Sequence, residues 1–307
     1  MHILPAFTQV IEAEDKAVAN KKSERTILVT GATGHQGGAV ITQLHAKSFP
    51  VRALTRNPEK PEARKLVGHG TEVVRADLND PESLTRAVDG VYGVFSVLTH
   101  VEHGAAVEVR EGINLADAAK RARVSHFVYS SVASANQQTG IAHFDSKARI
   151  EDHLRGTGLR YTIFRPVFFM ENLLGMRERI EQGSLALPLK RETRLQMIAV
   201  DDIGAFVALA FEKPGHWQGR TMEIAGDEVS MAELAATLSR IAGREIRYEH
   251  TPWDQFEQAA GREMTSMWRW FEETGYHLDI SAVRREYPNL MTLERWFQSK
   301  WRKAFAA

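Results

Sequence analysis

The chain has 307 residues, of which 43% are hydrophobic and 25% are charged, and these values exclude a largely disordered chain or a collagen-like repeat. Its 39 lysine and arginine residues balance its 39 aspartate and glutamate residues, so no basic surface for nucleic acid or for an anionic membrane is expected. The absence of cysteine excludes disulfides, cysteine-ligated zinc, iron–sulfur clusters and thiolate nucleophiles.

Residues 1–24 are predicted to form a flexible tail. The apolar run Met1–Phe7 is short and is followed by charged residues without a small-residue cleavage pattern, which is unlike a signal peptide. No apolar run in the chain approaches the ~20 residues that span a bilayer. We therefore expect a cytoplasmic protein.

From Thr26 onward, short β-branched runs alternate with amphipathic stretches. The expected strands are Thr26–Thr30, Val51–Thr55, Glu72–Ala76, Gly90–Val97, His126–Ser131 and Tyr161–Arg165. The expected helices between them are Gly37–Lys47, Pro81–Val88, Ala105–Arg123 and Asp145–Gly156. Strands and helices that alternate at this spacing indicate βαβ units. The sequence therefore predicts an α/β fold with a doubly wound parallel sheet covered by helices on both faces.

The pattern changes after Pro166. We expect helices at Asn172–Gln182 and Asp201–Phe211, strands at Gln196–Val200, Thr221–Ala225 and Glu245–His250, and a further helix that opens at Pro252. The carboxylates of Asp201 and Asp202 are suited to capping the helix that they begin. Ser230 and Glu233 form a capping box ahead of a helix whose apolar residues continue to Ile241.

The composition also divides the chain, because all six tryptophans lie at position 217 or beyond. We expect a first domain over residues 25–166 and a smaller C-terminal α/β domain over residues 167–307. Residues 196–225 are expected to pack back on the first domain. No low-complexity linker separates the two domains, so they are expected to share a tight interface.

A glycine-rich turn follows the first expected strand. The sequence Gly31-Ala-Thr-Gly34-His-Gln-Gly37 lies between that strand and the first expected helix. In such a turn Gly31 permits the tight bend, Gly34 lets the backbone approach a pyrophosphate, and Gly37 permits close packing of helix on strand. The free N–H groups of the first helical turn then face the anion. The first domain is therefore predicted to bind a dinucleotide.

The tip of the second strand indicates which dinucleotide. An NAD-binding protein carries a carboxylate there, ~20 residues after the turn, to hold the ribose 2′-hydroxyl. Here the tip carries Arg56, with Lys60 four residues further on. A guanidinium group matches a phosphate, and an ammonium group adds charge, so the pair predicts NADP(H). At the end of the third strand, Asp77 and Leu78 are candidates for adenine contacts, although Asp77 could equally cap the turn that follows it.

With these motifs the chain resembles the NmrA-like family of atypical short-chain dehydrogenases/reductases. The matching segments are the glycine turn, Thr55–Lys60, Ala142–Lys147 and Arg165–Asn172. The resemblance implies a Rossmann-type domain that binds NADP(H), with a cleft closed by the smaller domain. The cofactor contacts that it implies are Gly31, Thr33, Gly34, His35, Gln36, Gly37, Arg56, Lys60, Asp77, Leu78, Thr99, Lys147, Phe168, Phe169 and Asn172.

The resemblance also identifies the candidate catalytic residues. Short-chain reductases use Tyr-x-x-x-Lys, whereas this chain has His143-Phe-Asp-Ser-Lys147. Lys147 is expected to hold the nicotinamide ribose and is a candidate acid or base. His143 shares a helix face with Lys147; the neighbouring ammonium is expected to lower the pKa of His143, and a largely neutral imidazole donates a proton poorly. Ser131 is expected to line the cleft or to satisfy backbone groups.

Two functions remain open from the sequence. Without the tyrosine, hydride transfer to a small quinone or carbonyl remains feasible, because an electron-poor acceptor can take its proton from water. The alternative is a non-catalytic NADP(H) sensor that binds a regulatory protein partner. An enclosed aromatic pocket would favour the enzyme, and the missing tyrosine favours the sensor.

Other groups of residues give weaker evidence for a functional site. His100 and His103 flank Val101-Glu102 but lack the spacing of a known metal motif, so no metal site is expected. No G-x-S-x-G elbow surrounds Ser130 or Ser131, which argues against a hydrolase. Met264, Met267, Trp268 and Phe271 have helical spacing and are expected to belong to the core, although such a stripe could also line an acceptor pocket or a partner surface.

Overall fold

The computed structural model describes residues 25–301, and the predicted tail over residues 1–24 lies outside them. A seven-stranded sheet with the order β10-β6-β5-β4-β1-β2-β3 forms its centre, and every neighbouring pair in it is parallel. Its strands are β1 (Ile27–Val29), β2 (Val51–Thr55), β3 (Glu72–Arg75), β4 (Gly93–Ser96), β5 (His126–Ser130), β6 (Tyr161–Pro166) and β10 (Thr221–Ile224). The predicted Rossmann-type, doubly wound fold is confirmed.

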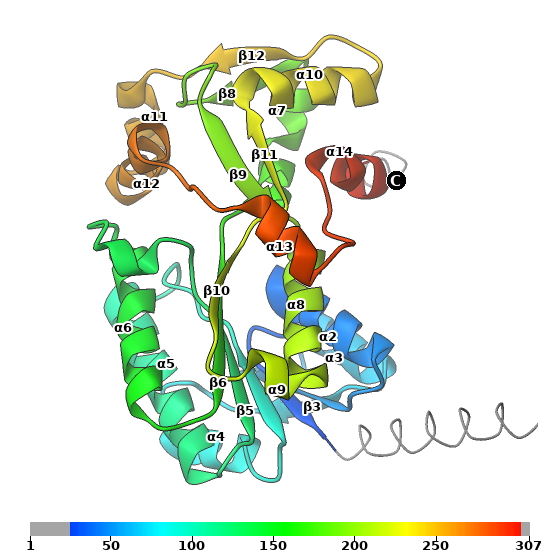
Figure 1. Ribbon diagram of the computed structural model, residues 1–307, viewed down its shortest axis with the longest axis vertical. Helices are drawn as coiled ribbons and strands as arrows, with labels where there is room; N and C mark the ends of the chain where they lie inside the picture. Colours follow the sequence, from blue (N-terminus) through cyan, green and yellow to red (C-terminus); the bar gives the residue numbers. More distant parts are fainter. Residues whose placement is uncertain (1–24, 302–307) are drawn as a thin grey trace, which may run out of the picture.

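Helices cover both faces of this sheet (Figure 1). One layer contains α2 (His35–Ala46), α3 (Pro61–Gly68), α8 (Val200–Glu212) and α9 (Pro214–Trp217), and the other contains α4 (Pro81–Ala87), α5 (Ala105–Arg121) and α6 (Ala142–Gly156). The side chains of β1, which point alternately to the two faces of the sheet, show why both helix layers form. Ile27 and Val29 pack into the core shared with α2 and α8, whereas Leu28 packs into the core shared with α4 and α5. A strand that is apolar on both faces needs a helix on each.

The remaining elements form a smaller unit beside the carboxyl ends of the central strands (Figure 1). Its two sheets have the orders β11-β9-β7 and β12-β8. The strands are β7 (Phe168–Phe169), β8 (Ser184–Leu187), β9 (Arg194–Ile198), β11 (Asp227–Ser230) and β12 (Arg247–His250). The helices are η2 (Met170–Met176), α7 (Arg177–Glu181), α10 (Met231–Ala242), α11 (Trp253–Ala260), α12 (Arg262–Glu273), α13 (Ile280–Glu286), α14 (Leu293–Trp296) and η3 (Phe297–Trp301).

Chain segments cross between the two units. Strand β10 lies at the edge of the central sheet, parallel to β6, and α8 packs so closely on α2 that the backbone of Gly204 meets the backbone of Ala39. The domain boundary at residue 166 stays a prediction. Among the described helices, none has both the length and the apolar character that crossing a bilayer requires.

Three local features differ from the sequence predictions or sharpen them. Helix α3 was not predicted, because Ala63 is its one buried residue and its sequence therefore carries no apolar stripe. The capping box of Ser230 and Glu233 is confirmed at the start of α10. The prediction that Asp201 and Asp202 cap their helix is wrong: α8 begins at Val200 without a side-chain cap.

The Asp202 side chain instead binds the C-terminal segment. Its Oδ2 accepts a hydrogen bond of 2.8 Å from the backbone N–H of Met291, and the residue is only 2% exposed. Burial raises the pKa of Asp202 to about 7, since a charged carboxylate loses its hydration there. Asp202 is thus a buried acid that fastens residue 291 to the first turn of α8.

This burial predicts a pH dependence of stability. The raised pKa means that the folded state binds a proton that the unfolded state, with a carboxyl pKa of ~3.9, releases. The contribution of Asp202 to the free energy of unfolding is therefore complete at low pH, and it is lost as pH rises through about 7. Asp202→Asn keeps an acceptor oxygen without the charge, so above pH ~8 it is expected to be more stable than the wild type, by ~1–3 kcal/mol in the free energy of unfolding.

Urea unfolding at pH ~5 and pH ~8 measures this difference. The two proteins are expected to differ much less at the lower pH. Asp254→Asn, which changes an exposed acid in the first turn of α11, is the control and is expected to show the same small effect at both values. An Asp202→Asn variant that loses as much stability as the wild type between the two pH values would contradict the assignment.

Candidate nucleotide-binding cleft

The order of the strands places the topological switch point of the central sheet between β1 and β4, and the space beyond it is called the cleft here. Strands β2 and β3 follow on one side of β1, and β5 and β6 follow on the far side of β4, so the connections leave in opposite directions at this point. Ligands of doubly wound sheets bind at such a switch point, beyond the carboxyl ends of the strands. Thr30, which follows β1, connects the ends of these two strands. Its Oγ1 donates a hydrogen bond to the carbonyl of Val97, just after β4, and accepts one from the N–H of Val97; both are 2.9 Å long.

The glycine turn follows β1 directly. Gly31 has φ +57°, in the left-handed region, where a side chain is unfavourable. A Cβ atom at residue 37 would lie 2.1 Å from the carbonyl oxygen of Gly31, so only glycine permits α2 to begin this close to β1. Gly31, Thr33, Gly34 and His35 are exposed, whereas Gly37 is buried. The turn thus presents an open backbone at the N-terminus of α2.

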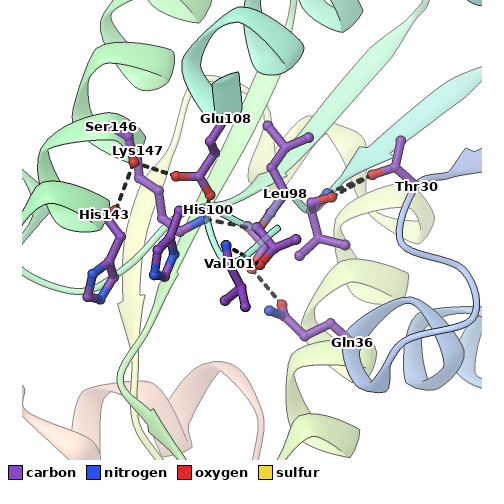
Figure 2. A network of polar contacts seen from close by, with 12 residues as sticks. Thr30, Gln36, Leu98, His100, Val101, Glu108, His143, Ser146 and Lys147 are labelled. Atoms are coloured by element: carbon purple, nitrogen blue, oxygen red, sulfur yellow. Dashed lines mark hydrogen bonds and ion pairs between the residues drawn. The ribbon is translucent and has the colours of Figure 1, made fainter. Parts of the chain in front are cut away.

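Gln36, in the first turn of α2, faces the sheet. Its Oε1 accepts a hydrogen bond of 2.7 Å from Oγ of Ser130 at the end of β5 (Figure 2). Ser130 therefore ties the start of α2 to a strand on the other side of β4. This contact gives Ser130 a structural role at the end of β5, whereas the role expected for Ser131 stays a prediction.

Arg56 lies at the tip of β2, as predicted, and contacts the loop that follows β4. Its guanidinium donates a hydrogen bond of 2.6 Å to the carboxylate of Glu102, and the two side chains are 56% and 53% exposed. This hydrogen bond lowers the pKa of Glu102 and raises the pKa of Arg56. The carboxylate of Glu102 thus occupies the anion-binding face of Arg56.

A cavity of about 340 Å³ lies beside Arg56. Its lining includes two more arginines, Arg75 and Arg86, together with Asp77. Oδ1 of Asp77 accepts a hydrogen bond of 2.8 Å from the backbone N–H of Asn79, so Asp77 caps the turn and faces the cavity as well. Asp80 also lines the cavity, so three guanidinium groups and two carboxylates surround it, and the guanidinium groups are the donors that could hold an anionic ligand.

Lys147 projects from α6 toward the end of β4. Its Nζ donates to Oε1 of Glu108 at 2.8 Å and to the carbonyl of Leu98 at 3.3 Å (Figure 2). Glu108 is fully buried and also accepts a hydrogen bond from Ser146. Burial by itself raises the pKa of Glu108, but the charge and hydrogen bond of Lys147 and the hydrogen bond of Ser146 outweigh it, and that pKa is lowered overall. A buried carboxylate therefore holds the ammonium group at the cleft.

His143 lies one turn before Lys147 and is nearly buried, with its side chain 11% exposed. Burial lowers the pKa of His143, the carboxylate of Glu263 opposes that shift, and the charge of Lys147 contributes least to it. The predicted direction is confirmed, but the main cause is loss of hydration and not the neighbouring ammonium. The imidazole is consequently a weak proton donor near neutral pH.

The other predicted site residues take varied positions. Thr99 is exposed in the loop after β4, and its Oγ1 accepts a hydrogen bond from the N–H of Val101. Lys60 is exposed at the start of α3, and Leu78 and Phe169 are half-buried. Phe168 is buried against Trp268 and Phe271 of α12, with ring centroids 5.6 and 6.1 Å away, and Asn172 is exposed in η2. The nicotinamide contacts assigned to Phe168, Phe169 and Asn172 stay predictions.

Sequence reasoning did not find Glu102 or Glu108. In the sequence Glu102 stands out only as a neighbour of two histidines, and Glu108 lies in the first turn of a helix, where an acidic residue is ordinary. The signal that could have found Glu108 is its burial, because a fully buried carboxylate needs a charged partner. That burial exists only once α5 packs on α6.

Known proteins are similar to this chain in sequence. The NmrA-like family matches residues 23–297. The NAD(P)H azoreductase of Xenophilus azovorans is 34% identical over 235 residues, which cover 76% of this chain and 79% of the relative. Quinone oxidoreductase 2 of Escherichia coli (strain K12) is 30% identical over 229 residues, covering 73% of this chain and 77% of the relative.

A solved structure agrees at the level of the fold. The negative transcriptional regulator NmrA, in complex with NADP, superposes with a TM-score of 0.77 at 20% identity, covering 92% of this chain and 97% of that one. The resemblance inferred from the glycine turn and from the His143–Lys147 segment is therefore confirmed, and the chain belongs to the NmrA-like family.

Proposed function

We propose that the protein is an NADPH-dependent reductase that transfers hydride to a small quinone or carbonyl acceptor. Two observations carry the proposal: an open glycine turn lies at the N-terminus of α2, and Arg56 and Arg75, at the tips of β2 and β3, line one cavity. Relatives described as an NAD(P)H azoreductase and a quinone oxidoreductase support it. Both descriptions are those of reductases acting on electron-poor acceptors.

The residues of the cleft fit NADPH better than NADH. The exposed N–H groups at the start of α2 suit a pyrophosphate, and the cavity beside Arg56 lies where a 2′-phosphate would follow from the ribose. Strand β2 does not end in a carboxylate residue. The carboxylate that pairs with Arg56 is that of Glu102, which belongs to the loop after β4. An incoming phosphate can replace the Glu102 carboxylate on the guanidinium, because both are anions that match its geometry.

Lys147 is suited to positioning the cofactor. An ammonium group has three N–H donors, and the structure assigns two of them to Glu108 and Leu98. The third can donate to a hydroxyl of the nicotinamide ribose. The dihydronicotinamide supplies the hydride, and the reduced acceptor gains one proton, so that a quinone becomes a hydroquinone and NADPH becomes NADP⁺.

The source of this proton limits the choice of acceptor. His143 is a poor donor because burial lowers its pKa, and Lys147 already binds a buried carboxylate. A quinone can accept hydride first and take its proton from water, whereas an unactivated ketone needs an acid at the moment of transfer. We therefore propose quinones and similarly electron-poor molecules as the main acceptors.

A non-catalytic NADP(H) sensor is the second candidate. The replacement of tyrosine by His143 favours it, and the solved regulator NmrA binds NADP in the same fold. In that case the cofactor would control the binding of a protein partner without being consumed.

Substitution of Arg56 tests the choice of cofactor. Arg56→Ala removes the bidentate donor for the 2′-phosphate, and a hydrogen bond to a charged group is worth ~1.5–3 kcal/mol. NADPH is therefore expected to bind about 10- to 100-fold more weakly to this variant, while the affinity for NADH stays nearly constant. Calorimetric titration with each nucleotide measures both dissociation constants.

Two further variants sharpen this test. Arg240→Ala removes an arginine that is likewise 56% exposed and paired with one carboxylate, but outside the cleft, and is expected to leave both affinities unchanged. Glu102→Gln removes the competing carboxylate and is expected to tighten the binding of NADPH alone. Equal losses for NADPH and NADH in Arg56→Ala would contradict the 2′-phosphate assignment.

Turnover separates the enzyme from the sensor. The wild-type protein is expected to consume NADPH in the presence of benzoquinones and naphthoquinones, and much more slowly with simple alkyl aldehydes, because these need an acid that the cleft does not provide. The loss of NADPH absorbance over a panel of both acceptor classes measures the rates. Tight binding of NADPH without consumption by any acceptor would favour the sensor.

A further inference from the structure

Glu108 and Ser146 form a buried chain of hydrogen bonds that ends at Lys147 (Figure 2). Each oxygen of the Glu108 carboxylate has its own donor: Oε1 accepts from Nζ of Lys147 at 2.8 Å, and Oε2 accepts from Oγ of Ser146. Glu108 belongs to α5, whereas Ser146 and Lys147 are successive residues of α6. The carboxylate is therefore fixed at both oxygens, and it connects two helices at the point where Lys147 reaches the cleft.

The surroundings of Glu108 keep its carboxylate charged. Glu108 lies in the first turn of α5, where the helix dipole favours an anion. Burial raises the pKa of Glu108, but the charge of Lys147 and the hydrogen bonds from Lys147 and Ser146 together lower it further. A buried carboxylate that stays ionised needs a cation beside it. The charges of Glu108 and Lys147 therefore depend on each other.

The sheet beneath this pair contributes no second anion. Tyr129 of β5 is fully buried, and its hydroxyl has no hydrogen-bond partner in the part of the chain that the structure describes. Burial, reinforced by the charge of Glu108, raises the pKa of Tyr129 well above its usual value. The phenol therefore stays neutral and cannot balance the ammonium of Lys147.

The groups that face Lys147 from α6, from the loop after β4 and from α12 do not replace Glu108 either. Burial lowers the pKa of His143, and His100 affects the pKa of Glu108 less than Lys147 does. The carboxylate of Glu263 lies 3.0 Å from Nδ1 of His143 and serves that imidazole. Among residues 25–301, Glu108 is the one carboxylate that pairs with Lys147.

We propose that Glu108, held by Ser146, is the positioning residue that keeps Lys147 charged and directed at the nicotinamide ribose. The Lys147 side chain is only 12% exposed, so without the carboxylate its burial would favour the neutral amine as pH rises. Glu108 and the carbonyl of Leu98 take two of the N–H donors of Lys147, and they thereby set the direction of the third. This inference rests on the proposed binding of NADPH.

Glu108→Gln tests the proposal, because it removes the charge and keeps the shape of the side chain. At pH ~7.5 its kcat with a naphthoquinone is expected to be about 10- to 100-fold below that of the wild type, since a small displacement of a reacting group has effects of that size. Its Kd for NADPH is expected to change less than about threefold at this pH, because the glycine turn and Arg56 still hold the phosphates.

The pH dependence of NADPH binding separates this role from a purely structural one. Between pH ~7.5 and pH ~9.5 the Kd of Glu108→Gln is expected to rise about tenfold, because a charged donor makes a stronger hydrogen bond than a neutral one. The Kd of the wild type is expected to stay constant over the same range. Calorimetric titration with NADPH at several pH values measures both proteins.

Two milder variants separate the charge of Glu108 from its position. Glu108→Asp keeps the charge on a shorter side chain, so its kcat is expected to fall while its Kd for NADPH stays independent of pH. Ser146→Ala removes the donor to Oε2 and is expected to lower kcat by less than Glu108→Gln does. Circular dichroism shows whether each variant is folded, and these two keep the proposal testable if Glu108→Gln is not.

Glu151→Gln is the matched control. Glu151 is fully buried like Glu108 and belongs to the same helix as Lys147, but its carboxylate pairs with Arg165 and Arg155. Its substitution is expected to lower the free energy of unfolding, because it leaves a buried arginine without its partner. The kcat of this variant and the pH dependence of its Kd are expected to equal those of the wild type.

The outcomes distinguish this proposal from the reductase proposal. If Glu108→Gln equals the wild type in kcat and in pH dependence, or if Glu151→Gln shows the same losses, the positioning role of Glu108 is overturned. A wild type that binds NADPH without consuming it contradicts the reductase instead, and the pH dependence of Kd then still tests Glu108. A wild type that does not bind NADPH overturns both proposals.

Discussion

Helix α2 can begin directly behind β1 only because residue 37 carries no side chain. A Cβ atom there would lie 2.1 Å from the carbonyl oxygen of Gly31, well inside van der Waals contact. With this close approach, the N-terminus of α2 opens onto the switch point between β1 and β4, where Thr30 and Gln36 contact the ends of neighbouring strands.

Arg56 and Lys147, two of the cations predicted for cofactor binding, are held in physically different ways. Arg56 pairs with Glu102 in solvent, where an ion pair contributes little and its partners exchange readily. Lys147 pairs with Glu108 in the protein interior, where loss of one partner would leave an uncompensated buried charge. Arg56 is thus a cation that can accept a new anion, whereas Lys147 is a fixed donor. This difference agrees with phosphate selection by the first and ribose positioning by the second.

Helix α12 connects the smaller unit to the nucleotide-binding half. Trp268 and Phe271 of this helix pack on Phe168, so the aromatic stripe expected from helical spacing belongs largely to the core, while Met264 at its start is exposed. The same helix brings Glu263 to His143. Packing on one face of α12 therefore determines which polar side chain on another face reaches the nucleotide-binding half.

Local patterns were sufficient for the Rossmann-type sheet, the glycine turn and the basic tip of β2, because strand alternation, glycine spacing and the residue at a strand end are properties of short segments. They were insufficient for α3, whose single buried residue leaves no stripe, and misleading for Asp202, whose carboxylate binds Met291 and not its own helix. They also identified the lowered pKa of His143 but assigned it to the wrong main cause.

The sequence by itself determined the family and the central sheet. Only the tertiary structure decided the partners of the charged residues: Glu102 for Arg56, Glu108 for Lys147, and Glu263 for His143. These partners are 46, 39 and 120 positions away along the chain. The physical reason is that backbone conformation depends on neighbouring residues, whereas the energy of a charge depends on burial and on whatever folding brings near it.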